Sequence, residues 1–520
     1  CVPTALDNVY FDINSFTGNT NQIVTTGSGD IRCRTMDWRG SEGNNPILQM
    51  GTVEISSAYI YGSLFLNNTL TINLPDVNFY FRSTEKGNTL VLHTFDFPNN
   101  VTFDGIDGEW TLGSNLNLDG NLILENGHFI SAGFDISCNY FEATNTDFGK
   151  KRTLDISNSI FTIHGYENGR ALYIFTADET ASETFTLLSI NSQIIILSNK
   201  DFYIGGSFSG KYTFNSILFS DGGTFNSNLI NTRVNDLTFE EGGELNGTVD
   251  IGKLTLNKGT KPNTFKFESN ITFPIEEFTA LGSCNFPIDI RGSKSGKQAD
   301  LEVKTSINAN FVLLTDINGI GSSVTYLANN SIKQTNVTNW TVSSITAVDL
   351  YWVGNGVNDE WSNYLNWSKT SGGVSEGCIP TELDNVFFDS NSFLGSKTAL
   401  INSDARCHNI TWTDDVDPSS IFKVQNQLDI HGLLDFSENM TLEMSGDLNF
   451  KGDGLTADKP IDFAGKALDG DVYFDGDDQS WILQNALTTT GDLFLDNGSL
   501  DTKGNKMSIS SFTSLNASPI

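Results

Sequence analysis

The chain has 520 residues, of which 38% are hydrophobic and 18% charged, and its formal net charge is −33 at pH 7. A negative charge of this size excludes binding to a nucleic-acid backbone, which requires clustered cations, and no hydrophobic run reaches the roughly 20 residues that a membrane helix needs. The abundance of Asn, Ser, Thr and Gly, with 37 phenylalanines and only 11 prolines, predicts an all-β protein of short strands joined by tight polar turns.

The chain opens with a segment that it repeats. Residues 1–16 read CVPTALDNVYFDINSF and residues 378–393 read CIPTELDNVFFDSNSF, with twelve of sixteen positions identical. A second motif, FDGIDGEW at 103–110, returns as FDGDDQSW at 474–481. A period this long indicates a tandem array of whole domains. Because the second copy follows a Trp-rich passage that the first lacks, and stops short of a full period, we expect the chain to be an excerpt of a longer repetitive protein.

A shorter period lies inside the long repeat. Apolar–polar–apolar triplets recur about every 20 residues, beginning at Leu70, Leu90, Trp110, Phe134 and Leu154. Alternation within a triplet marks a strand with one buried face, and a regular step of this length predicts one coil of a parallel β-helix, or β-solenoid. An array of β-sandwiches, with strands about 8–12 residues apart, is the alternative. The even step and the absence of hairpin turns favour the β-solenoid.

The period changes near Phe278, and this change sets the expected domain boundaries. A solenoid end exposes unpaired backbone and needs a cap, so we expect the first repeat unit to close before the Trp-rich passage. We predict a first unit at 1–349, divided into a disulfide head at 1–48, a β-solenoid at 49–277 and a closing cap at 278–349, then a Trp-rich bridge at 350–377 and the start of a second unit at 378–520.

The six cysteines indicate disulfide bonds and therefore an exported protein. Both copies of the opening segment place a second cysteine about thirty residues after the first, which predicts the bonds Cys1–Cys33 and Cys378–Cys407. Cys138 has an apolar counterpart in the second copy, so it is either a buried apolar residue or the partner of Cys284. The sequence shows no CxxC pairs or clustered histidines of the kind that a zinc site requires.

The turns of the repeated FDGxDxxW motif carry several carboxylates. Calcium prefers oxygen ligands of this kind, although no EF-hand or nonapeptide calcium pattern is present, and solvated turn charges are the simpler interpretation. Calcium is therefore the cofactor that the sequence leaves open. Its candidate ligands are Asp104, Asp107, Glu109, Asp475, Asp477 and Asp478.

Three tryptophans, Trp352, Trp361 and Trp367, lie in the passage between the two copies. Aromatic side chains beside a domain junction commonly form a small core that sets the angle between units, and we predict that these three pack between the units. A sugar-binding platform is the alternative, but spacings of nine and six residues do not place them on a common face.

The sequence shows no evident catalytic set. The chain has five histidines and contains no G-x-S-x-G, P-loop or H-E-x-x-H motif. Enzymes that cleave glycosides use two carboxylates within reach of one bond, whereas adjacent strand residues such as Glu240 and Glu241 point to opposite faces. We therefore predict a protein that is not an enzyme.

The Trp-rich passage and the opening segment after it carry a family resemblance. The run YWVGN…EWSNYLNWS…SGG…CIPTELDNVFFDSNSF, over 351–393, and the preceding SGKQADLEV, LLTDING and NVTNW resemble a tandem repeat of very large surface proteins in gliding and predatory Bacteroidota. These passages cover about a third of the chain. The resemblance implies export by type IX secretion, an extracellular or cell-surface location, and a role in adhesion or filaments without catalysis.

These observations predict the structural shaft of a large extracellular adhesin or surface filament, used in attachment, gliding or prey capture. Its expected partners are the neighbouring repeat units of the same chain and, in one version, identical chains assembled side by side in a homo-oligomeric bundle. A carbohydrate-binding repeat module is the alternative function, and a polysaccharide-degrading β-helix enzyme is a third. We expect neither nucleic-acid binding nor membrane insertion.

Overall fold

The computed structural model describes residues 2–16, 22–27, 29–41, 45–51, 57–145, 150–176, 184–206, 211–229, 231–259, 263–343, 346–375, 378–393, 397–455 and 457–514. The chain divides into two compact units, 1–283 with 287–343 and 284–286 with 344–520, which we call the first and the second unit. Strands account for 54% of the residues. The helical element among the described residues is a single 3₁₀ turn, η1 (Tyr364–Asn366).

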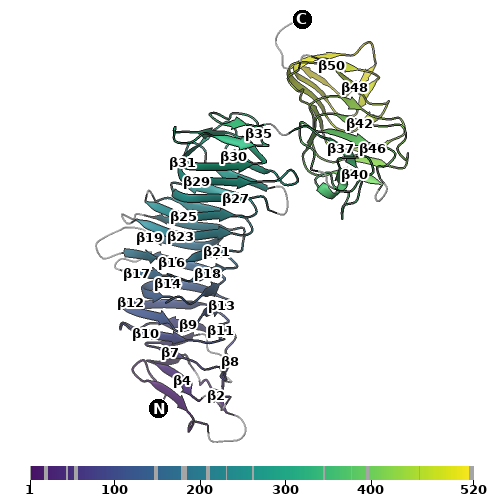
Figure 1. Cartoon of the computed structure of the whole chain (residues 1–520). Helices are drawn as coiled ribbons and strands as arrows, with labels where there is room; N and C mark the ends of the chain where they lie inside the picture. The colour runs from purple at the N-terminus through teal and green to yellow at the C-terminus, as the bar shows by residue number, and fades with distance from the viewer. Residues whose placement is uncertain are drawn as a thin grey trace. The chain divides into compact units, whose positions relative to one another are not determined.

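Parallel pairing between successive coils makes both units β-solenoids, as the sequence predicts. In the first unit Val101 pairs with Leu122 and Leu122 with Phe141, one coil after another. Figure 1 shows the strands of this unit stacked in chain order. Phe141 then pairs with Leu172, and such longer coils raise the average to about 23 residues, above the predicted 20. The β-sandwich alternative is wrong, because sandwich strands pair antiparallel and these ladders are parallel.

Two long sheets and one short sheet form the walls of the first unit. The 20-stranded sheet contains β1 (Val9–Asp12), β3 (Ile31–Cys33), β4 (Met36–Gly40), β6 (Ser57–Ile60), β7 (Leu64–Phe65), β9 (Asn78–Phe81), β10 (Asn88–Val91), β12 (Val101–Leu112), β14 (Asn121–Ile130), β16 (Tyr140–Asn145), β17 (Lys151–Asp155), β19 (Arg170–Thr176), β20 (Thr184–Leu188), β22 (Asp201–Gly206), β24 (Thr224–Ser227), β26 (Gly243–Gly247), β28 (Asn263–Phe267), β30 (Ile288–Gly292), β32 (Val312–Thr315) and β35 (Ile332–Lys333).

The 13-stranded sheet contains β11 (Asp96–Phe97), β13 (Leu116–Leu118), β15 (Ile136–Cys138), β18 (Ile160–Ile163), β21 (Gln193–Ile196), β23 (Tyr212–Phe219), β25 (Thr232–Phe239), β27 (Asp250–Asn257), β29 (Thr272–Leu281), β31 (Ala299–Asn310), β33 (Ile317–Gly319), β34 (Leu327–Asn329) and β36 (Thr341–Val342). The short sheet contains β2 (Ile23–Thr25), β5 (Ile47–Gln49) and β8 (Thr71–Asn73).

The second unit repeats this construction with three sheets. The largest contains β37 (Asp349–Trp352), β38 (Trp367–Ser368), β39 (Asn385–Phe388), β41 (Ala405–Cys407), β42 (Ile410–Trp412), β44 (Leu428–Ile430), β45 (Leu434–Asp435), β47 (Leu448–Phe450), β48 (Lys459–Asp462), β50 (Val472–Leu483), β52 (Leu493–Asp501) and β54 (Phe512–Ser514). The two short sheets contain β40 (Thr398–Ile401), β43 (Ile421–Val424) and β46 (Thr441–Met444), and β49 (Ala467–Leu468), β51 (Leu487–Thr489) and β53 (Met507–Ser508).

Inward-facing side chains stack from coil to coil and form the core. In β25 the buried residues alternate with partly exposed ones, and Val234, Leu237 and Phe239 point inward. Phe239 stacks on Phe219 of the preceding coil, with ring centroids 4.6 Å apart. Burying one such side chain contributes roughly 1.5–3 kcal/mol, so stability accumulates one coil at a time.

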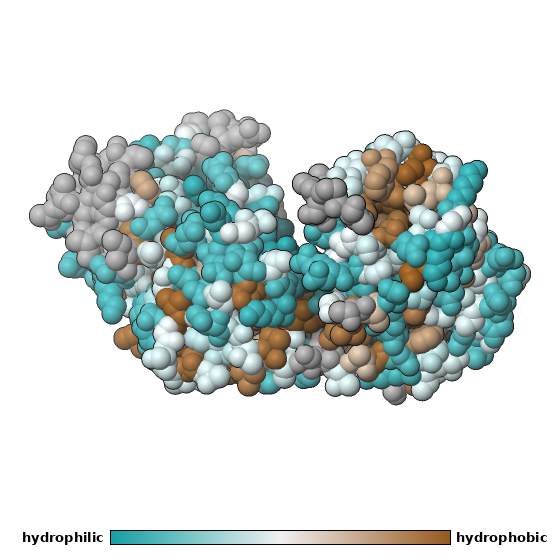
Figure 2. All heavy atoms as spheres, turned by 90° about the horizontal axis from the view of Figure 1, so that it is seen from above, coloured by the Kyte–Doolittle hydropathy of each residue, from teal (hydrophilic) through white to brown (hydrophobic). Residues whose placement is uncertain are grey.

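Polar side chains stack in the same way at the corners of the coils. Asn158 and Asn191 both adopt positive φ, a conformation that asparagine tolerates better than most residues, and Nδ2 of Asn191 donates a hydrogen bond to Oδ1 of Asn158 at 3.1 Å. The outer surface is mixed: the face drawn in Figure 2 is largely hydrophilic, with hydrophobic residues in small scattered groups. Polar corners and apolar interiors thus repeat at the same step.

The Trp-rich passage at 350–377 is part of the second unit and not a bridge. Leu350 pairs in parallel with Val386, which pairs in turn with Ile410. Leu350 and Trp352 are buried with Tyr351 less so between them, which is the alternation of a coil strand. The passage therefore forms the first coil of the second solenoid.

The predicted head and closing cap are also parts of the first solenoid. β1, β3 and β4 lie in the same sheet as the later coils. Within the predicted cap at 278–349, the first unit continues its ladders through β36 and ends at Ser343. Tyr326 and Trp340 join the same core as the earlier coils, whereas 284–286 and 344–349 belong to the second unit. The change of period near Phe278 thus marks a change in coil sequence within one continuous core.

Candidate functional site

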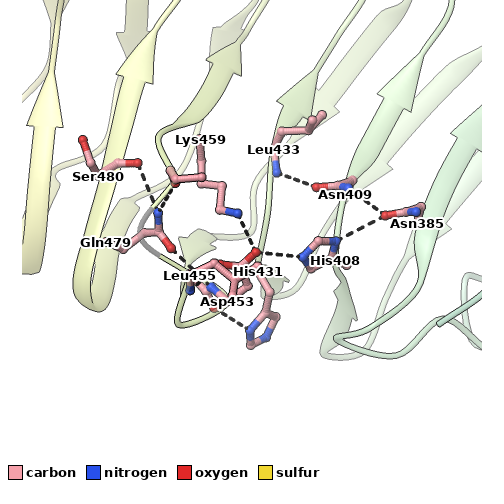
Figure 3. Close-up of polar contacts among 12 residues, drawn as sticks. Asn385, His408, Asn409, His431, Leu433, Asp453, Leu455, Lys459, Gln479 and Ser480 are labelled. Atoms are coloured by element: carbon pink, nitrogen blue, oxygen red, sulfur yellow. Dashed lines mark hydrogen bonds and ion pairs between the residues drawn. The ribbon is translucent and has the colours of Figure 1, made fainter. Parts of the chain in front are cut away.

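A cavity of about 520 Å³ in the second unit brings together two histidines, an aspartate and two asparagines (Figure 3). Consecutive coils supply these residues. Asn385 begins β39, His408 follows β41, His431 follows β44 and Asp453 lies beyond β47. The site is therefore built by stacking one corner of the solenoid.

Asp453 is the charged centre of this cavity, with 8% of its side chain exposed. Its Oδ2 accepts hydrogen bonds from Nζ of Lys459 at 2.5 Å and from Nε2 of His408 at 3.2 Å, and Oδ1 accepts one from the backbone N–H of Leu455 at 2.9 Å. Burial alone would raise the pKa of Asp453, but these hydrogen bonds together lower it. The carboxylate is therefore ionised and lies between two basic side chains.

His408 contacts an acceptor oxygen through each ring nitrogen. Its Nδ1 lies 3.2 Å from Oδ1 of Asn385, while Nε2 faces Asp453. The Asn385 amide is oriented by its own donation from Nδ2 to Asp349 at 2.8 Å. The ring of His408 is therefore held between two polar side chains that other coils supply.

His431 contacts the backbone of the next coil. Its Nδ1 donates to the carbonyl of Gly452 at 3.1 Å, and burial lowers the pKa of His431 although Glu382 and Asp429 oppose the shift. Burial therefore favours the neutral form of the His431 imidazole. Among the described residues no hydroxyl or thiol is hydrogen-bonded to either ring, so no activated nucleophile is assembled. The cavity presents polar side chains that can hold a small molecule.

The corresponding corner of the first unit carries different side chains. Arg34 stands where the second unit has His408, each directly after a cysteine of the repeat, and Arg34 pairs with Glu85 at 2.5 Å. The first unit therefore connects its coils at this corner with an exposed ion pair. Both units use this corner to connect their coils. The first unit does so with an ion pair, and the second unit does so with histidines.

The prediction from sequence missed this cavity, because none of its residues forms a local motif. The available signal was a period: Asn385, His408, His431 and Asp453 recur at about the length of one coil. Polar residues at the coil step must stack in one corner once the fold is a solenoid.

A second hollow in the second unit, of about 650 Å³, is acidic. Asp414, Asp435 and Asp462 line it. Burial and the neighbouring Asp462 and Asp414 raise the pKa of Asp435. The outer two carboxylates accept hydrogen bonds, from Ser437 to Asp414 at 2.7 Å and from Asn485 to Asp462. A carboxyl group of raised pKa beside other carboxylates can donate a proton. This hollow is therefore the place where the third candidate function, sugar cleavage, would have its general acid.

The predicted calcium ligands do not form a metal site. No group of three or more His, Cys, Asp or Glu side chains arranged to hold a metal ion occurs among the described residues. Oδ2 of Asp104 lies 3.6 Å from Nε of Arg82, and Oδ2 of Asp475 lies 3.0 Å from Nζ of Lys451. Basic side chains of the protein therefore neutralise the two carboxylates that begin the motif.

The remaining candidate ligands flank a bulge. Asp107 and Asp478 adopt the same φ of 56° in the two copies, and the pairing register of β12 shifts between Asp104 and Glu109. A bulge re-aims the side chains that follow it, and here the following Trp110 becomes fully buried, as does its counterpart in the second copy. Asp477 and Asp478 line a hollow of about 510 Å³ beside this bulge. The repeated motif thus directs a tryptophan into the core.

The three tryptophans predicted to pack between the units lie in the core of the second unit. Trp352, Trp361 and Trp367 are 0%, 3% and 0% exposed. Trp367 lies 5.1 Å from Trp352 and 4.7 Å from Trp361 between ring centroids, and its Nε1 donates to the carbonyl of Trp361 at 2.8 Å. Buried rings cannot form the alternative sugar platform. The inter-unit interpretation fails because all three rings join the core of a single unit.

The cysteine pairing differs from the prediction. Cys284 is bonded to Cys378, so the predicted Cys378–Cys407 bond and the candidate Cys138–Cys284 bond are both wrong. Cys33, Cys138 and Cys407 are buried free cysteines, which also removes the predicted Cys1–Cys33 bond; Cys1 itself lies outside the described residues. Burial raises the pKa of Cys33 to about 12 and that of Cys138 and Cys407 further, so these thiols behave as apolar core residues.

Comparisons with protein-family models, with curated proteins and with solved structures found no match to this chain. Within the described residues no helix is long and apolar enough to cross a membrane.

Proposed function

We propose that this chain is a structural, non-catalytic shaft segment of a large extracellular adhesin or surface filament. The observation that carries the proposal is the repetition of one construction: two solenoid units begin with nearly the same sequence, and each stacks its coils around a continuous core. In such a fold each coil contacts only its neighbours, so length is added without redesigning the core.

The chemistry of the surface agrees with this role. A net charge of −33 keeps long extracellular chains apart and soluble. The disulfide between Cys284 and Cys378 suits an oxidising compartment, where such bonds persist. The likeness of the Trp-rich and opening segments to repeats of bacterial surface proteins points in the same direction.

Immunogold labelling of intact cells that produce the protein tests this proposal. Antibodies raised against this chain should label surface fibres on unpermeabilised cells, and the label should disappear after mild surface proteolysis. Label seen only in permeabilised cells would contradict an extracellular shaft.

A carbohydrate-binding module is the second candidate, and the acidic hollow lined by Asp435 favours it. Hydroxyl groups of a sugar bind well to several carboxylates and amides that face one hollow. A glycan array should then show binding that is lost in Asp435→Ala and kept in Asp415→Ala, whose carboxylate is not among the residues that line this hollow. The same samples, incubated with polysaccharides, test the third candidate, because an enzyme would release reducing ends.

A further inference from the structure

One outward-facing row of side chains crosses the largest sheet of the second unit. Each member pairs in register with the next, from β37 through β39, β42 and β45 to β48. All five are partly or fully exposed, whereas the residues beside them in the chain are buried. Because paired strands lie roughly 4.8 Å apart, the row covers about 19 Å of outer surface. Its members are Tyr351, Phe387, Thr411, Asp435 and Asp462.

The acidic end of this row lines the hollow of about 650 Å³. Among the described residues no ion pair joins Asp414, Asp435 or Asp462 to a basic side chain, and the charged groups that act on Asp435 are the other two carboxylates. Lys466 donates to the backbone carbonyl of Glu438 at 2.7 Å and not to a carboxylate. A hollow lined by charges of one sign attracts the opposite charge. Since no described group of acidic side chains is arranged for a metal ion, an ammonium or guanidinium group suits it better.

The first unit holds a guanidinium at the equivalent place. There β4 pairs with β7 as β42 pairs with β45, so that Phe65 is the counterpart of Asp435. Arg39 is the counterpart of Thr413, directly after the repeated tryptophan. Cζ of Arg39 lies 3.8 Å from the centroid of the Phe65 ring, and its Nη2 donates to Oδ2 of Asp37 at 2.6 Å. In the second unit a threonine replaces this arginine and a carboxylate replaces the ring, so a cation from outside can take the same place.

The other end of the row is aromatic. Tyr351 and Phe387 stack with ring centroids 5.1 Å apart, and both are partly exposed. The apolar C–H face of a pyranose ring packs on aromatic surface of this kind, and sugar hydroxyl groups bond to nearby carboxylates and amides. Thr411 connects this pair to Asp435 in the row. A ligand made of several sugar rings in line therefore reaches both ends.

We propose that this row binds an oligosaccharide of amino sugars with free amino groups, such as a chain of glucosamine. Its ammonium groups bond to Asp435 and Asp462, and its rings pack on Phe387 and Tyr351. The ligand supplies from outside the cation that Arg39 supplies in the first unit. This inference rests on the carbohydrate-binding candidate of the proposed function, and deepens it by naming the charge of the sugar.

Fluorescence anisotropy with a labelled oligomer of beta-linked glucosamine tests the proposal on the intact 520-residue chain. Slightly acidic buffer keeps the amines of the oligomer protonated. The oligomer should bind at one saturable site. Its fully N-acetylated form has the same rings without the charges, and should bind at least about tenfold more weakly because charge-assisted hydrogen bonds are lost. Equal binding of the two oligomers would overturn the proposal.

Matched variants of the chain locate the site. Asp435→Asn should weaken binding of the glucosamine oligomer at least about tenfold. Asp404→Asn removes one charge from an exposed residue outside the hollow, and should leave binding unchanged. Thr413→Arg gives the second unit the arginine of the first, and should block the hollow to a similar degree as Asp435→Asn. If the variants at 435 and 404 act alike, the oligomer responds only to the net charge of −33, and the proposal is wrong.

Further ligands separate this inference from the candidate function on which it rests. An arginine peptide of equal charge that binds as tightly as the glucosamine oligomer would assign the row to a protein partner and remove the proposal. A neutral glucose oligomer that binds as tightly, and is lost in Asp435→Asn, would keep the carbohydrate-binding candidate and remove the preference for amino sugars. Binding of no oligosaccharide would remove both, and would leave the shaft to the test by immunogold labelling.

Discussion

The two copies of the opening segment contain the same aspartate in two environments. Thr4 donates its backbone N–H to Asp7 at 2.8 Å, and Thr381 donates to Asp384 at 2.9 Å. In the first copy these bonds lower the pKa of Asp7, whose side chain is exposed. In the second copy burial raises the pKa of Asp384 despite the same bonds. The local sequence determines the turn, whereas burial beneath the Trp-rich coil determines in which direction the pKa of the aspartate shifts.

The largest expected effect comes from removing part of that coil. Trp367→Ala leaves a cavity among Trp352, Trp361 and Phe388, and should destabilise the second unit by about 3–5 kcal/mol. Urea unfolding of the full chain, followed by circular dichroism, should show one transition moved to lower urea and the other unchanged. The matched control is Leu6→Ala in the first copy, at a residue that is 86% exposed and should shift neither transition measurably. If Trp367→Ala shifts neither transition, the assigned covering role is wrong.

The disulfide is the next largest effect. Cys284 and Cys378 are separated by 94 residues in the sequence, and Cys378→Ser should cost the second unit about 2–4 kcal/mol. Non-reducing peptide mapping by mass spectrometry should recover Cys284 joined to Cys378, and alkylation of the denatured chain should label Cys33, Cys138 and Cys407. A recovered Cys378–Cys407 peptide would restore the pairing expected from sequence spacing.

The corner networks of the two units give a third contrast. Asp453→Ala leaves Lys459 and His408 without their shared acceptor and should destabilise the second unit by about 1.5–3 kcal/mol. Arg34→Ala breaks a pair whose side chains are 44% and 60% exposed, and should cost the first unit less than about 1 kcal/mol. Thermal unfolding of both variants tests this order. Equal losses would show that the hydrogen bonds of Asp453 contribute no more than a surface ion pair.

Much of the fold follows from the sequence because the coils obey a local rule. Each apolar–polar–apolar triplet gives its strand one apolar face. Because the triplets are about one coil apart, the apolar faces of successive coils stack and bury one another. The same alternation explains Cys33: Arg32 is exposed and Cys33 buried at the end of β3, so the thiol points into the core. Spacing between cysteines carried no information on which side chains meet in space.

The functional surfaces were harder to predict because they depend on contacts between coils. His408 and Asp453 are 45 residues apart and become neighbours only after the intervening coils are stacked. The tryptophans at 352–367 were predicted to pack between the units because they lie in the passage between the two copies of the opening segment. Trp352 and Trp367 lie on the short strands β37 and β38, and Trp361 lies between them, an arrangement that no period in the sequence identifies.

The smallest effect is a difference in the sign of pH dependence between the two copies. The folded-state pKa of Asp384 lies above its unfolded value of about 3.9, so its contribution to stability is full below that pH and is lost as pH rises through the folded pKa. Asp7 has a lowered pKa, so its contribution is present above pH 3.9 and is lost as pH falls. The stability of the chain minus that of Asp384→Asn should therefore fall as pH rises from about 4, and the same difference for Asp7→Asn should rise. If both differences change in the same direction, burial beneath the Trp-rich coil does not control the pKa of this aspartate.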